Sequence, residues 1–180
     1  MKQNSRRNFL KLGMLAAALP LPAVAKAWQS APERRLRFHN LHTGEHLDLA
    51  YWVQGAYVPE SLAEINHLLR DFRNDEVAVI EPGLLDLLNR VDVALGASQP
   101  FQVISGYRSP ATNHLLAERS SGVAKHSLHM EGKAIDIRIP GIALADLRKT
   151  GLALRGGGVG YYPASDFVHL DVGRVRTWGG

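Results

Sequence analysis

Apolar and polar residues alternate over several short segments of the chain, which is the pattern of half-buried β-strands. Residues 133–139 follow Gly132 and read Lys-Ala-Ile-Asp-Ile-Arg-Ile. A strand here points its three isoleucines to one face and Ala134, Asp136 and Arg138 to the other. The isoleucines are expected to contact the core, so the opposite face presents the carboxylate of Asp136.

Residues 167–172 show the same alternation and predict a second strand. Its valines and leucine share one face, whereas Phe167, His169 and Asp171 share the other. His169 and Asp136 are therefore expected to converge on one side of one sheet.

The remaining periodic segments complete the expected fold. Residues 36–41 and 45–52 alternate around a Thr-Gly pair and predict a β-hairpin, preceded by a mobile entry at residues 28–35. A further strand is predicted at residues 101–105. Helical periodicity predicts four helices, at residues 60–72, 82–95, 110–119 and 142–154. The last helix is expected to end at the glycine run 156–158, which permits a C-cap and close backbone approach. These elements predict an α+β class: one compact domain with a mainly antiparallel sheet and helices packed on one side.

The N-terminal segment reads as an export signal. Residues 5–11 are Ser-Arg-Arg-Asn-Phe-Leu-Lys, and an apolar run follows over residues 12–25. A paired arginine, a modest apolar run and small residues at its end are typical of a bacterial twin-arginine signal. We expect residues 1–27 to engage the twin-arginine translocase and to be removed, which leaves residues 28–180 as one periplasmic domain. An uncleaved membrane anchor is the alternative.

The net positive charge of the chain comes mainly from this N-terminal segment. Residues 1–27 contain five Lys and Arg residues and no acid, so subtracting five from the formal net charge of +4 leaves −1 for the rest. This balance gives no support to nucleic-acid binding, which requires a basic face on the folded domain. After removal of the signal, no stable membrane insertion is expected. The absence of cysteine excludes a lipoprotein anchor and disulfides.

Three residues have the chemistry of an open zinc site. Two histidines and one carboxylate are a ligand set that catalytic zinc sites use while keeping a position for water. His129 lies outside both predicted strands, and Gly132 allows the backbone to bend so that His129 and Asp136 reach one ion with His169. Each residue alone has an ordinary alternative as a hydrogen-bonded or solvent-facing side chain.

The same residues carry a family resemblance. The pattern S-x-H-x-x-G-x-A-x-D over residues 127–136, followed by a second histidine, resembles the LAS metallopeptidases, which include lysostaphin, D-Ala-D-Ala metallopeptidases and hedgehog domains. The resemblance extends to residues 105–109 with Asn113, to residues 157–162 and to residues 169–171, and it covers residues 36–178. The chain is most similar to the YcbK or MepK-like murein endopeptidases of Gram-negative bacteria. A hedgehog or D-Ala-D-Ala-peptidase-like fold is implied.

The resemblance implies a role for each matching residue. His129, Asp136 and His169 would bind one Zn²⁺ per chain. Asp166 stands three residues before the last ligand, where some relatives place a general base, and an ordinary turn residue is its alternative. Its rival is Asp171, which would act either as the base or as a partner that orients an imidazole.

Two further residues are implied to contact the substrate. Arg108 matches the family arginine that faces the scissile carbonyl or a substrate carboxylate, and a structural salt bridge is its alternative. Ser127 is a second candidate for substrate binding.

The resulting expectation is a periplasmic, zinc-dependent murein endopeptidase that hydrolyses the peptide cross-links of peptidoglycan during cell-wall growth. Its partners would be peptidoglycan stem peptides. Two alternatives stay open: a D-Ala-D-Ala carboxypeptidase, and a zinc-containing cell-wall binding module without hydrolysis.

Overall fold

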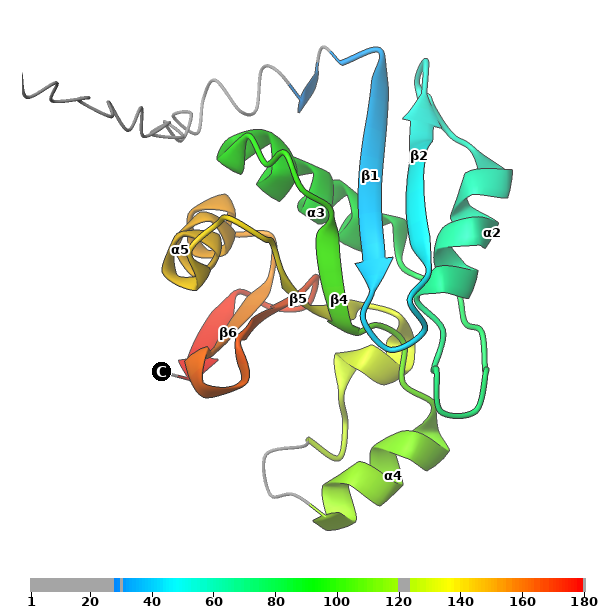
Figure 1. Ribbon diagram of the computed structural model, residues 1–180, viewed down its shortest axis with the longest axis vertical. Helices are drawn as coiled ribbons and strands as arrows, with labels where there is room; N and C mark the ends of the chain where they lie inside the picture. The colour runs from blue at the N-terminus through cyan, green and yellow to red at the C-terminus, as the bar shows by residue number, and fades with distance from the viewer. Residues whose placement is uncertain (1–27, 30, 120–123, 180) are drawn as a thin grey trace, which may run out of the picture.

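One mixed sheet of eight strands organises the chain, in the order β3-β2-β1-β4-β5-β7-β6-β8 (Figure 1). The computed structural model describes residues 28–29, 31–119 and 124–179. The strands are β1 (Glu33–Asn40), β2 (His46–Val53), β3 (Ala56–Tyr57), β4 (Phe101–Ser105), β5 (Ala134–Arg138), β6 (Gly158–Tyr162), β7 (Phe167–Asp171) and β8 (Arg176–Gly179). β1 and β4 pair in parallel, as do β6 and β8, and the other neighbours are antiparallel. The predicted mainly antiparallel α+β fold is confirmed.

Among the described residues, three of the four α-helices with given bounds pack against this sheet. The helices are α2 (Pro59–Leu68), α3 (Pro82–Leu95), α4 (Pro110–Arg119) and α5 (Leu144–Leu154). α2 lies against β2, α3 against β1, and α5 against β6 and β7. α4 lies apart from the other helices, beyond the end of β4 (Figure 1).

The two faces of the sheet differ in chemistry because side chains alternate along each strand. Phe38 pairs with Phe101, and Val103 pairs with Ile137, which in turn pairs with Val168. All five are buried, and they form part of the core beneath the helices. The polar residues of β5 and β7 are consequently directed to the opposite face.

The predicted ends of some elements were wrong. The helix predicted to reach Phe72 ends at Leu68, because a turn follows in which the Asp71 amide binds the Glu76 carbonyl. The Asp71 carboxylate accepts from the Arg73 amide, and such local bonds compete with helix formation. The predicted entry segment is also shorter, since β1 begins at Glu33.

Two roles were predicted for the glycine run after α5, a helix cap and a close backbone approach, and only the second is confirmed. The cap of α5 is Arg155, with a left-handed φ of 50°, and not a glycine. Gly157 permits close approach, since a Cβ there would lie 1.9 Å from the Asp171 carbonyl oxygen.

Residues 1–27, the predicted export signal, lie outside the described residues. Within the part of the chain that the structure describes, no helix combines the length and the apolar character needed to cross a bilayer.

Candidate metal centre

The sheet places two of the three predicted ligands side by side. Asp136 of β5 and His169 of β7 are register partners on adjacent antiparallel strands. Ser105 of β4 pairs with Asp136, and Gly160 of β6 pairs both with His169 and with Trp178 of β8. These paired residues form one row across the sheet from β4 to β8. The predicted alternation therefore brings the carboxylate and the imidazole to one face.

A short helical turn carries the third predicted ligand. His129 lies in η1 (Leu128–Glu131), where the Ser127 hydroxyl accepts a hydrogen bond from the His129 amide. Gly132 ends this turn with φ 66°, a left-handed conformation that favours glycine. A Cβ at Gly132 would lie 2.1 Å from the Val79 carbonyl oxygen, so the glycine is required for two reasons. The bend predicted between His129 and Asp136 is present.

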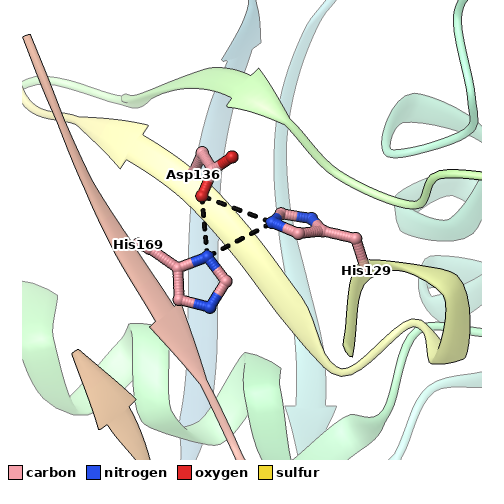
Figure 2. Close-up of side chains that lie close together, drawn as sticks. All are labelled: His129, Asp136 and His169. Atoms are coloured by element: carbon pink, nitrogen blue, oxygen red, sulfur yellow. Dashed lines mark hydrogen bonds and ion pairs between the residues drawn. The ribbon is translucent and has the colours of Figure 1, made fainter. Parts of the chain in front are cut away.

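The three side chains point toward one another from η1, β5 and β7 (Figure 2). His169 Nδ1 lies 2.8 Å from Asp136 Oδ1 and 3.2 Å from His129 Nε2. His129 Nε2 lies 3.3 Å from Asp136 Oδ1. All three residues are buried. Among the described residues, no other group of three His, Cys, Asp or Glu side chains is arranged to hold a metal ion.

The outer hydrogen bonds of the two imidazoles direct their free nitrogens into this cluster. His129 Nδ1 lies 2.7 Å from the Gly106 carbonyl, which can only accept, so Nδ1 carries the proton. His169 Nε2 lies 3.1 Å from Asp171 Oδ2 and donates to that carboxylate. When both rings are neutral, His129 Nε2 and His169 Nδ1 face Asp136 Oδ1 as acceptors, and a metal ion or a proton between these three atoms would relieve their repulsion.

This donor set fits a zinc ion. Zinc bonds of 2.0–2.1 Å in a tetrahedron place neighbouring donors about 3.3 Å apart. Two of the three donor separations, 3.2 and 3.3 Å, match that spacing, and the third is 2.8 Å. Each histidine also has the outer hydrogen-bond acceptor that is typical of metal-binding imidazoles.

The charges in the cluster support one another. Burial alone would raise the pKa of Asp136, but the neighbouring His129 and His169 outweigh it and hold this pKa well below its usual range. Burial likewise disfavours the charged form of His169, yet its bonds to Asp136 and Asp171 raise its pKa. The site thus keeps an ionised carboxylate beside its imidazoles.

Asp171 has the contacts of an orienting residue. Its carboxylate is fully buried and accepts from the Gly158 and Gly173 amides, from Arg176 and from His169. Burial would raise the pKa of Asp171, but these donors outweigh it and lower it. Of the two roles considered for Asp171, this geometry supports the one that orients an imidazole.

The cluster opens into a cleft of about 410 Å³. Arg108 and Ser127, the predicted substrate-binding residues, line it, as do the aromatic residues Tyr162, Phe167 and Trp178. The indole nitrogen of Trp178 donates to the Tyr162 hydroxyl at 2.7 Å. The sequence analysis did not identify this aromatic wall as part of the site.

Arg108 lies beside the cluster and is held there by side-chain hydrogen bonds. Its guanidinium donates to Asn113 Oδ1 at 3.2 Å and to Ser105 Oγ at 3.4 Å, and it lies 4.0 Å from Asp136 Oδ2. Its Nε is buried and has no hydrogen-bond partner among the described residues. Burial lowers the pKa of Arg108 and Asp136 opposes that shift. A buried cation with an unused donor at the cleft suits an incoming carbonyl or carboxylate.

Asp166 lies outside the residues that line the cleft. It follows η2 (Pro163–Ser165) with a left-handed φ of 54°, and its exposed carboxylate binds Arg138 at 2.6 Å. Arg138 and Asp136 share one face of β5, about 6.7 Å apart along the strand. The structure therefore places Asp166 at the face of the cluster but does not bring it into the cluster.

Comparison with known proteins now gives the family. A family model described as peptidoglycan L,D-endopeptidase MepK (Peptidase_M15_2) matches residues 28–178. The chain belongs to this peptidase family. The resemblance stated from the sequence is confirmed.

Relatives in this family are similar over nearly their whole length. The peptidoglycan L,D-endopeptidase MepK of Escherichia coli K12 is 48% identical over 177 residues, which are 97% of each chain. A protein of Haemophilus influenzae named "Probable peptidoglycan L,D-endopeptidase MepK" is 40% identical over 179 residues, 98% of this chain and 96% of that one.

Proposed function

We propose that this protein is a zinc-dependent peptidase that hydrolyses peptide cross-links of peptidoglycan. The observation that carries the proposal is the buried cluster of His129, Asp136 and His169, in which both imidazoles aim an acceptor nitrogen at the carboxylate. This arrangement supports one zinc ion per chain. When bound, the ion supplies a Lewis acid that polarises a carbonyl and lowers the pKa of water.

The substrate follows from the family and from the cleft. The relatives are named L,D-endopeptidases of peptidoglycan, which supports cleavage of an L,D peptide bond within the cell wall. The cleft beside the cluster is lined by residues of η1, β6, β7 and β8. Such a cleft suits an internal bond of a cross-linked stem peptide.

The residues around the cluster would bind the substrate and transfer the proton of the attacking water. Arg108 would bind the carbonyl oxygen or a nearby carboxylate as negative charge develops there. Ser127 would contact the peptide while its hydroxyl also caps η1. Asp166 would act as general base, which requires its carboxylate to leave Arg138 when the peptide binds.

Export completes the proposal. The paired arginines in residues 1–27 favour the twin-arginine route, which carries folded proteins, to the periplasm. Replacement of both arginines by lysine is expected to retain the protein in the cytoplasm, as measured by cell fractionation. Periplasmic recovery of that variant would contradict this route.

The activity is tested by digestion of purified sacculi with residues 28–180, followed by separation of the muropeptides. We expect cross-linked dimers to decrease and monomers to increase. A zinc chelator and His129→Ala should both abolish the change. His114→Ala is the matched control, because His114 is an exposed histidine of α4.

Other outcomes would redirect the assignment. Unchanged dimers with shortened stems would indicate a carboxypeptidase. A folded, zinc-loaded protein that changes no muropeptide would indicate a binding module.

A further inference from the structure

We propose that Arg176, on the last strand, is a positioning residue that holds His169 in its metal-binding orientation through Asp171. Metal affinity would then depend on β8, an element outside the family motif of His129, Asp136 and His169. The inference rests on the proposed metal site.

The link from Arg176 to Asp171 is a two-point contact. Arg176 Nη2 lies 2.7 Å from Asp171 Oδ2, and Nη1 lies 3.1 Å from Oδ1. A planar guanidinium that binds both oxygens of a carboxylate fixes its direction as well as its position. Asp171 is fully buried, whereas one third of the Arg176 side chain is exposed.

The two carboxylate oxygens of Asp171 are held by different donors. Oδ1 also accepts from the Gly158 and Gly173 amides, at 2.9 and 2.8 Å. Oδ2 contacts Arg176 and the His169 imidazole at 3.1 Å. The oxygen that faces the imidazole is therefore held by Arg176, while the backbone holds the other.

Space for this contact is provided at Gly158. A Cβ there would lie 2.4 Å from Asp171 Oδ2 and 2.5 Å from Arg176 Nη1. Gly158 is also the register partner of Arg176 between the parallel strands β6 and β8. The absence of a side chain at Gly158 lets the guanidinium reach the buried carboxylate.

The same strand supports His169 from a second direction. The Arg176 guanidinium lies 4.7 Å from the centre of the Trp178 ring, and that ring lies 5.1 Å from the His169 imidazole. Both side chains project from β8 on the face of the cluster. Strand β8 thus lies against His169 directly through the Trp178 ring, and Arg176 reaches it indirectly through the Asp171 carboxylate of β7.

The consequence concerns the protonation of His169. An ionised Asp171 can only accept, so His169 Nε2 carries the proton and Nδ1 keeps its lone pair for the metal. Without Arg176, Oδ2 loses its strongest donor, and the buried carboxylate is held only by the two backbone amides at Oδ1 and by the His169 imidazole itself. Zinc affinity is expected to fall by about 10–100-fold, the effect of losing an outer partner of a metal ligand.

The test compares Arg176→Gln and Arg176→Lys with the matched control Arg174→Gln. Arg174 is exposed, and only its carbonyl contacts Arg176. Zinc affinity is measured by competition with a chromogenic chelator. Nitrogen-15 NMR of the zinc-loaded protein reports which His169 nitrogen is protonated and which binds the metal, and thermal melting reports the stability of each variant.

We expect Arg176→Gln to weaken zinc binding and to mix the two protonation forms of His169. Arg176→Lys should recover part of the affinity, and Arg174→Gln should match the wild type. A purely structural role would lower the melting temperature while leaving the His169 signals and the zinc affinity at their wild-type values, and that result would overturn the proposal.

Two further comparisons distinguish failure of this proposal from misfolding of the variant and from failure of the proposed function. If Arg176→Gln does not fold, Arg176→Lys is compared with Arg174→Lys in its place, because lysine keeps the positive charge but cannot bind both carboxylate oxygens as a planar guanidinium does. Zinc affinity and the NMR spectrum are both measured without substrate, so they decide the proposal even if the wild type leaves sacculi intact.

Discussion

Asp136 Oδ1 lies 2.8 Å from His169 Nδ1 because the two residues face each other across neighbouring strands of one sheet. Their separation is set by strand pairing and not by a loop. His129 is brought to the same point by η1, whose backbone is joined to the Arg108 loop by the bond from the Arg108 amide to the His129 carbonyl. The rigid pair and the attached turn together define the candidate site.

The first prediction concerns Asp136→Asn. An amide removes the negative charge that the two histidines hold ionised, so zinc affinity should fall by more than the roughly 10–100-fold effect of losing an outer partner. Zinc binding is measured by calorimetry, together with circular dichroism to verify the fold. Asp146→Asn, at an exposed position in α5, is the control. Equal zinc affinities for the two variants would remove Asp136 from the site.

Local sequence pattern predicted this part of the molecule well. Period-two alternation placed Asp136 and His169 on one face, and the glycine after η1 indicated the bend beside His129. Both signals are local, because side-chain direction and left-handed backbone conformation depend on neighbouring residues.

Other parts depended on distant contacts. Arg176 and Trp178 belong to a strand of four residues that pairs in parallel with β6, and no alternation long enough to predict it exists there. The helix end at Leu68 depends on the turn at Asp71, whose carboxylate also binds the Ser109 amide far along the chain. Such pairings are visible only in the folded structure.

The second prediction tests Asp166 as general base. Asp166→Asn should lower kcat on a cross-linked muropeptide by about 10²–10⁴-fold, because a positioned base contributes a factor of that size. Zinc affinity should stay unchanged, since Asp166 lies outside the cluster. Arg138→Gln is the matched variant, because it breaks the same ion pair and leaves the carboxylate. Similar small losses for both variants would show that the pair is structural.

The third prediction concerns the aromatic wall. A Cβ at Gly160 would lie 2.7 Å from the Trp178 ring, so Gly160→Ala should displace the indole and destabilise the fold by about 1–3 kcal/mol. Tryptophan fluorescence and urea unfolding measure the two effects, and activity should fall with them. At Gly83 the nearest atoms to an added Cβ lie 3.9 Å away, so Gly83→Ala should leave the fluorescence unchanged. An unaltered spectrum for Gly160→Ala would contradict this packing.

The fourth prediction is a pH dependence of stability. The Asp71 carboxylate is fully buried and accepts a hydrogen bond from the Ser109 amide at 2.9 Å. Ser109 directly follows Arg108 in the chain. Burial would raise the pKa of Asp71, but hydrogen bonds from Thr112 and Ser109 outweigh it and lower it. A carboxyl whose pKa is lower in the folded state stabilises the fold above its unfolded pKa of about 3.9, and this contribution is lost as the pH falls through the folded value.

The measurement is the free energy of unfolding in urea for wild type and Asp71→Asn at several pH values. At pH 7 the variant should be less stable by about 1–3 kcal/mol, because the amide accepts these bonds less well than a buried carboxylate. The difference should persist down to about pH 5 and shrink below about pH 4. Asp75→Asn is the control, since Asp75 is exposed and asparagine tolerates its positive φ. A difference that is constant from neutral to acid pH would mean that Asp71 acts through its shape and not through its charge.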